Sequence, residues 1–186
     1  MSTTALLLID IQNDYFPGGR FPLPGAEPAA AQAQKLLAYF RQRHLPVMHI
    51  QHQSKHEGAT FFLTNTEGLT IHGNVAPLAD EPVLLKHRPN SFLETGLETL
   101  LRQRGVHTLV VAGMMTNMCV DATVRAAADM GFSCVLAHDA CAAADLGFNG
   151  VNVPAAQVHA AFVAALGYAY AKVVSCEEYV ADKVAR

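Results

Sequence analysis

The sequence predicts a doubly wound α/β domain, and three observations support that prediction. Short runs rich in Leu, Val and Ile recur without polar alternation, as is typical of parallel strands covered on both faces. Helical patterns lie between several of these runs, and repeated strand–helix–strand order defines this fold class. The 186 residues suffice for one domain with a substantial core but would be cramped for two. We therefore expect a single domain over residues 1–186.

Six apolar runs are the predicted strands. They are bounded by loops or by helical patterns, and in chain order they span 5–10, 46–52, 82–87, 107–113, 132–139 and 172–176.

Four segments have helical patterns: 27–44, 91–105, 116–131 and 153–169. The second begins with a Ser-x-x-Glu capping box made by Ser91 and Glu94. Thr116 is the expected N-cap of the third, and Gly131 its stop. The stretch 53–81 has little periodicity and is predicted to be loop.

Composition limits the class of protein and of partner. A hydrophobic fraction of 51% excludes a disordered chain. The net charge is −3 and there is no run of Lys or Arg, so neither a nucleic acid nor an anionic membrane is an expected partner. The opening MSTTALLLID is not a secretory signal, and no apolar stretch approaches the roughly 20 residues that span a bilayer. We expect a cytoplasmic protein.

The four cysteines form no CxxC pair and show no metal-ligand spacing, so we expect free thiols in a reducing compartment. The GxSxG, GxGxxG and GxxxxGK[ST] motifs are also absent from the sequence. A nucleotide cofactor therefore has no support, and we expect none.

Three chemically capable residues stand at or just after predicted strand ends, where ligands bind in open α/β sheets. Asp10 ends the first strand, Lys86 ends the third, and Cys119 follows the fourth. Each also has an ordinary structural interpretation: a loop-capping acid, a solvated lysine and a core cysteine. If the strands are neighbours, the three side chains can converge, and proton exchange requires that they lie closer than about 8 Å.

Such a trio suits nucleophilic catalysis. With Thr116 as N-cap, Cys119 lies in the first helical turn, where amides lack intrahelical partners and the dipole favours an anion. A nearby Lys86 ammonium would lower the thiol pKa further, toward neutrality or below. Asp10 could accept the thiol proton and return it to a leaving amine.

Three segments resemble the isochorismatase-like cysteine hydrolases, which include nicotinamidases, N-carbamoylsarcosine amidases and streptothricin hydrolases. They are IDIQNDYF at 9–16, Lys86 followed by Ser-Phe at 91–92, and GMMTNMCVDATVRAA at 113–127. The resemblance implies a three-layer α/β/α fold around a six-stranded, largely parallel sheet. It implies a catalytic triad of Asp10, Lys86 and Cys119. It also implies a cis peptide bond before Met115, with the amides of Met115 and Cys119 forming an oxyanion hole.

The expected activity is hydrolysis of a C–N bond in a small amide, cyclic amide or carbamoyl compound through a thioester. Two alternatives stay open: isochorismatase-type vinyl ether hydrolysis, and a non-catalytic binding or redox module on the same fold. Family members are commonly oligomers, so the resemblance also implies a homo-oligomer that acts on a small-molecule substrate.

The predicted substrate-binding residues follow strand ends or lie in the loop after the second strand: Gln12, Phe16, His52, Phe61, Phe62 and Asn117. Nicotinamidases bind a metal through an Asp-x-His motif after that strand, and the corresponding HIQHQSKHEG at 49–58 has no such Asp. His52, His56 and His72 could meet, but without a carboxylate at the expected place we expect no metal.

Overall fold

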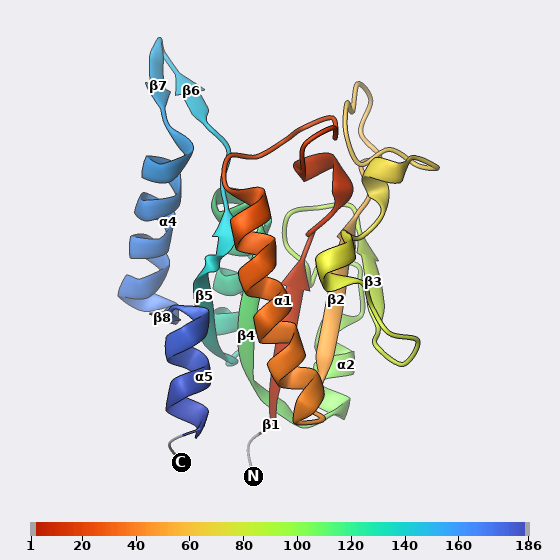
Figure 1. Ribbon diagram of the computed structural model, residues 1–186, viewed down its shortest axis with the longest axis vertical. Coiled ribbons are helices and arrows are strands. Elements are labelled where there is room, and N and C mark those ends of the chain that lie inside the picture. The colour runs from red at the N-terminus through yellow and green to blue at the C-terminus, as the bar shows by residue number, and fades with distance from the viewer. Residues whose placement is uncertain (1–2, 185–186) are drawn as a thin grey trace.

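The computed structural model describes residues 3–184 and is built around a six-stranded parallel sheet with the strand order β3-β2-β1-β4-β5-β8 (Figure 1). Every neighbouring pair of these strands is parallel. The predicted fold class is therefore confirmed, as are all six predicted strands. Their bounds are β1 Thr3–Ile9, β2 Val47–His52, β3 Val83–Lys86, β4 Val106–Met114, β5 Ser133–Ala142 and β8 Ala171–Val174.

Helices pack on both faces of the sheet through two hydrophobic clusters, one on each face, so the fold has three layers. Leu6 and Leu8 of β1 pack in one cluster with residues of α1 (Ala26–Gln42) and α5 (Cys176–Val184). The other cluster contains Leu7 and Ile9 with residues of the helices on the opposite face, α2 Leu97–Gln103, α3 Asp121–Asp129 and α4 Ala155–Ala169. Burial on both faces explains why the strand sequences are apolar without alternation.

The predicted helix over 91–105 is shorter than expected, because α2 begins only at Leu97. Glu94 has a φ of 59°, in the left-handed region, and Gly96 is the N-cap with a φ of 74°. The Ser91 hydroxyl accepts a hydrogen bond from Thr123 Oγ1 at 2.8 Å. The Ser91–Glu94 capping box is thus wrong: Ser91 is fully buried in a tertiary contact with α3 and caps nothing.

The segment after β4 also departs from the prediction. It forms a π-helical turn, η4, at Thr116–Val120, and the regular helix α3 starts at Asp121. Thr116 lies inside this turn, so it is not the N-cap, and its hydroxyl is 2.9 Å from His159 Nδ1 of α4. This contact fastens the turn that carries Cys119 to a neighbouring helix. Gly131, with a φ of 86°, lies just beyond the end of α3 as expected.

Several elements escaped sequence-based prediction. A turn of 3-10 helix, η1, forms at Asn13–Tyr15, and two more lie within the predicted loop, η2 at Glu67–Leu69 and η3 at Gly73–Val75. Strands β6 (Leu146–Phe148) and β7 (Val151–Val153) form an antiparallel hairpin that projects beyond α4 (Figure 1).

Gly113 brings β4 very close to β1 near the carboxyl ends of both strands. Its φ is 143°, and a Cβ added there would collide with the backbone of Ile9. Only glycine combines this φ with such a close approach of two backbones. The contact sets the spacing between the strand that leads to Asp10 and the strand that leads to Cys119.

No helix within residues 3–184 is both long enough and apolar enough to cross a membrane.

Candidate active site

Asp10, Lys86 and Cys119 meet at the carboxyl end of the sheet. Lys86 Nζ lies 2.7 Å from Asp10 Oδ2, and both side chains have no exposed surface. A carboxylate oxygen of Asp10, a ring nitrogen of His52 and Cys119 Sγ all lie within 4.8 Å of one another. The structure thus brings together the three residues predicted from the strand ends, well within the distance that direct proton exchange requires.

The strands that carry these residues are not all neighbours. β1 and β4 are adjacent, but β2 separates β1 from β3. The long Lys86 side chain spans this gap and passes His52, its partner in the β2–β3 register. Asp10 follows β1 with a φ of 51°, a conformation that is uncommon outside glycine and is concentrated at functional sites.

The Lys86 ammonium has three oxygen or nitrogen partners. Besides Asp10 Oδ2, it donates to the carbonyl oxygen of Arg88 at 3.0 Å and lies 3.0 Å from His52 Nδ1. An ammonium can only donate, so Nδ1 of His52 must be the acceptor and its ring proton sits on Nε2. These contacts hold the charge of Lys86 in place beside Asp10.

Burial dominates the electrostatics of the site. It raises the pKa of Asp10, against the opposing effect of Lys86. Burial acts to lower the pKa of Lys86, but Asp10 and Cys119 outweigh it and the pKa is raised. The pKa of Cys119 is also raised, first by burial and then by Asp10, although Lys86 acts to lower it.

The predicted lowering of the Cys119 pKa is therefore wrong for the resting site. Sequence reasoning weighed the helix terminus and Lys86, but it could not weigh the loss of solvent around a thiol that is 6% exposed. In the resting site Cys119 is a thiol beside the Asp10 carboxyl group. A carboxylate oxygen of Asp10 lies within 4.8 Å of Cys119 Sγ, so Asp10 is placed to take the thiol proton.

His52 should make the folded protein less stable in acid. Its pKa is lowered from 6.5 to about 3 by burial first and by Lys86 second. Below pH 6.5 the unfolded chain binds a proton at this position and the folded chain does not, so the free energy of unfolding falls between pH 6.5 and 3. Urea unfolding from pH 7 to pH 4 measures this slope.

The matched control for that slope is His52→Gln, whose amide oxygen can still accept from Lys86. Other groups whose shifts have the same sign, such as Glu81 with a pKa of about 2, remain in both proteins. The slope should be shallower in His52→Gln, and equal slopes would show that His52 is not kept neutral by folding.

The turn that carries Cys119 begins with an unusual backbone. The peptide bond between Met114 and Met115 is cis, at the place where the family resemblance implies one. The amides of Met118 and Val120 both donate to the carbonyl oxygen of Met115, which closes the turn.

A cavity of about 250 Å³ opens onto Cys119. It is lined by three of the six predicted substrate-binding residues, His52, Phe61 and Phe62, and by Met115, whose amide was expected in the oxyanion hole. Its size suits a small molecule. Its remaining walls were not predicted as substrate contacts: Tyr15, Ser54, His56, His87, Arg88, Pro89 and Met118.

Three predicted substrate contacts lie elsewhere. The Gln12 amide is buried and ties loops together, since it donates to the carbonyls of His52 and Leu69 and accepts from the His52 amide. Phe16 stacks on His72, with ring centroids 3.7 Å apart, and lines a different hollow. Asn117 is buried in η4 and does not line the cavity.

Three of the cavity residues that were not predicted could have been found from the sequence. His87, Arg88 and Pro89 directly follow Lys86, so the strand-end rule that selected Lys86 applies equally to them. Tyr15 replaces Phe16 in the wall because the 3-10 turn η1 changes which side chain faces inward, and η1 had no clear sequence signal.

The histidines considered for a metal are not assembled into a site. His72 stacks on Phe16 and does not line the cavity that His52 and His56 share. Within residues 3–184, the group that could chelate an ion is Asp10, His52 and Cys119. The Lys86 ammonium contacts two of these three, so the donor set fits a bound cation poorly.

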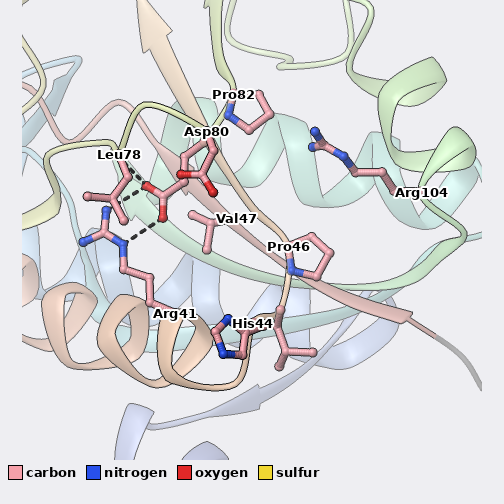
Figure 2. A pocket seen from close by; sticks show the side chains of 10 residues that line it. Arg41, His44, Pro46, Val47, Leu78, Asp80, Pro82 and Arg104 are labelled. Atoms are coloured by element: carbon pink, nitrogen blue, oxygen red, sulfur yellow. Dashed lines mark hydrogen bonds and ion pairs between the residues drawn. The ribbon is translucent and has the colours of Figure 1, made fainter.

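A larger hollow, of about 470 Å³, lies at the other end of β2, near Pro46 (Figure 2). Arg41, which lines this hollow and is labelled in Figure 2, forms an ion pair of 2.7 Å with Glu81. Glu81 also contacts His49 Nε2 at 2.9 Å, so its carboxylate is already satisfied by the protein. Neither Cys119 nor Asp10 reaches this hollow, which leaves the smaller cavity as the candidate active site.

A thiol, a carboxylate and an ammonium buried together at the carboxyl ends of parallel strands define an α/β protein with a cysteine-centred site. The Isochorismatase domain profile matches residues 4–178, and the chain belongs to the isochorismatase family. The chain is 51% identical to the uncharacterized isochorismatase family protein YddQ of Bacillus subtilis (strain 168), over 96% of this chain and 99% of that protein.

Two further comparisons agree with this assignment. A crystal structure from Oleispira antarctica, named as an isochorismatase hydrolase, superposes with a TM-score of 0.93 and 54% identity, covering 97% of each chain. The maleamate amidohydrolase of Pseudomonas putida KT2440 is 34% identical over 73% of this chain and 70% of its own length.

Proposed function

We propose that this protein is a cysteine hydrolase that cleaves the C–N bond of a small amide, cyclic amide or carbamoyl compound. The observation that carries the proposal is the placement of Cys119 beside the buried Asp10–Lys86 ion pair at the base of a small cavity. A relative named maleamate amidohydrolase supports an amide as the substrate.

In the first step the thiol attacks the carbonyl carbon of the substrate. Asp10 takes the thiol proton as the C–S bond forms, because burial keeps Cys119 protonated until substrate arrives. The carbonyl oxygen becomes an oxyanion, and the backbone amides of Met115 and Cys119 donate to it. Each such donor is commonly worth about 3 kcal/mol in the transition state.

In the second step the C–N bond breaks and Asp10 gives its proton to the departing nitrogen. Ammonia or an amine leaves, and the acyl group stays on Cys119 as a thioester. Asp10 then takes a proton from water, whose oxygen attacks the thioester carbonyl and releases the acid. The proton returns to sulfur, so one water is consumed for each bond cleaved. Lys86 stabilises the carboxylate form of Asp10 between proton transfers.

The thioester provides the test. Acid quenching during turnover of a panel of small amides, lactams and ureas, followed by intact mass spectrometry, should show an acyl adduct that maps to Cys119. The adduct should be missing in Cys119→Ala. If isochorismate is instead cleaved by both wild type and Cys119→Ala, and no amide yields an adduct, vinyl ether hydrolysis is the better assignment.

We also propose that the protein works as a cytoplasmic homo-oligomer with one hydrolase domain over 1–186. Helix α4 contains no Asp, Glu, Lys or Arg, and burial lowers the pKa of its one histidine, His159. Much of the helix surface is nevertheless exposed. Tyr168 is 93% exposed, and Phe148 of the adjacent hairpin is 77% exposed. An uncharged apolar surface of this kind suits contact with a second copy, because no like charges would face each other.

A further inference from the structure

Tyr15 brings an unpaired hydroxyl group to the wall of the cavity that opens onto Cys119. The residue is only 2% exposed, yet its hydroxyl makes no hydrogen bond with any residue in the described range 3–184. The fully enclosed polar side-chain atoms that lack a partner in this range belong to Asp10, His49 and Asn117, not to Tyr15. The hydroxyl oxygen therefore meets the cavity, where a bound molecule can supply the hydrogen bond that the protein does not.

The aromatic ring that carries this hydroxyl is fixed by packing. It meets the Phe62 ring edge-on, with centroids 4.7 Å apart and planes at 66°, and it also contacts the rings of Phe21 and Phe61. The Phe62 amide donates to Asp14 Oδ2 at 2.6 Å, which joins the loop after β2 to the 3-10 turn that contains Tyr15. The hydroxyl is thus held at one place on the cavity wall by contacts from two segments.

Tyr15 also lies beside the reacting groups. It lines the same cavity as Cys119, and the charges of Cys119 and Asp10 add to the effect of burial in raising its pKa. The phenol therefore keeps its proton at neutral pH. A neutral hydroxyl can donate one hydrogen bond and can accept others through its oxygen.

The other polar groups of the reacting centre already have partners or tasks. The Lys86 ammonium has three protons and three partners in the protein, so none of its protons is left for a substrate. His52 accepts from Lys86 at Nδ1 and offers only its Nε2 proton. In the proposed mechanism Asp10 transfers protons and two backbone amides bind the carbonyl oxygen. The N–H groups of the substrate amide still need an acceptor, and the Tyr15 oxygen is available.

We propose that Tyr15 is a further catalytic residue, whose hydroxyl oxygen accepts a hydrogen bond from an N–H of the leaving nitrogen. This inference rests on the proposed amide hydrolysis, because it needs a leaving group that carries an N–H. When the carbonyl carbon becomes tetrahedral, the nitrogen gains a lone pair that has to face Asp10 to receive its proton. An acceptor that holds the N–H keeps the lone pair in that direction, and such orientation lowers the barrier.

The test uses Tyr15→Phe, which removes the hydroxyl and keeps the packed ring. The substrates are the small primary amide that wild type hydrolyses fastest and the methyl ester of the same acid. For the amide, kcat/KM should fall by about 3- to 10-fold, the value of one neutral hydrogen bond. For the ester it should be unchanged, because the leaving oxygen carries no hydrogen. The free energy of unfolding in urea should also be unchanged, because the hydroxyl has no partner in the protein to lose.

Tyr39→Phe is the matched control. Tyr39 also packs among aromatic rings, but it lines a separate hollow that neither Asp10 nor Cys119 reaches. This variant should keep the wild-type kcat/KM for both substrates.

Three results would overturn the inference and leave amide hydrolysis standing. They are an unchanged amide rate in Tyr15→Phe, an equal loss for amide and ester, which would place the hydrogen bond at the carbonyl oxygen, and a loss confined to the amide in Ser54→Ala instead. Ser54 is the comparison because its hydroxyl also lines the cavity without a partner among residues 3–184. If wild type shows no Cys119-dependent amide hydrolysis at all, the proposed function itself fails.

Discussion

Replacing Cys119 with alanine should lower kcat/KM for amide hydrolysis by at least about 10³-fold, the scale of loss when a catalytic nucleophile is removed. Asp10 and Lys86 would remain, but the site would have no atom able to form the thioester. Folding should be nearly unchanged, because Cys119 borders an open cavity and its loss creates no enclosed void. Steady-state ammonia release and urea unfolding measure the two effects.

Cys134→Ala is the matched control for Cys119→Ala. Cys134 is a buried thiol within β5 that packs in the hydrophobic core and does not line the cavity. Its replacement should cost stability and leave kcat intact. Full amide turnover by Cys119→Ala would show that the Cys119 sulfur takes no part in the reaction.

Replacing Lys86 with methionine should lower the free energy of unfolding at pH 7 by about 3–5 kcal/mol, the usual cost of leaving one member of a buried ion pair alone. Asp10 has no exposed surface, and among residues 3–184 its ion-pair partner is Lys86 alone. His52 and the Arg88 carbonyl would each lose a hydrogen-bond donor. The Asp10 pKa would rise further, so stability should recover as the pH falls and Asp10 is protonated. Urea unfolding at pH 5, 6 and 7 measures this.

Two further measurements complete the Lys86 prediction. The double variant Asp10→Asn/Lys86→Met buries no charge at this position, so it should regain much of the lost stability. Iodoacetamide should alkylate Cys119 more slowly in Lys86→Met than in wild type near neutral pH, because Lys86 acts to lower the thiol pKa. Unchanged alkylation would mean that the ammonium does not act on the sulfur.

The sheet was predictable because burial of both faces leaves a direct trace in the sequence. Leu6, Leu7 and Leu8 form an unbroken apolar run, and the structure divides them between two cores. The start of α2 was not predictable, because Ser91 and Glu94 have the spacing of a cap. Whether Ser91 caps a helix or bonds to Thr123 is decided by tertiary contacts that local sequence does not contain.

The site divides in the same way. The strand-end rule found Asp10, Lys86 and Cys119, and it needed only the order of elements along the chain. It could not show that the Gln12 amide donates its hydrogen bonds to loop carbonyls. Nor could it show that burial raises the pKa of Cys119 more than Lys86 lowers it. Both depend on how many atoms surround a group, and that number is set by the packed fold.

The close approach at Gly113 has a consequence for how such a protein could diverge. Any side chain at this position would push β4 away from Ile9, and with it the strand ends that lead to Asp10 and Cys119. Substitutions at Gly113 should therefore be nearly as damaging as substitutions of Cys119, the proposed nucleophile, although Gly113 does not line the cavity. New substrate specificity should therefore arise in the loops after β2 and β3. Cavity-lining residues there, such as Phe61 and Arg88, can change without altering the spacing of Asp10 and Cys119.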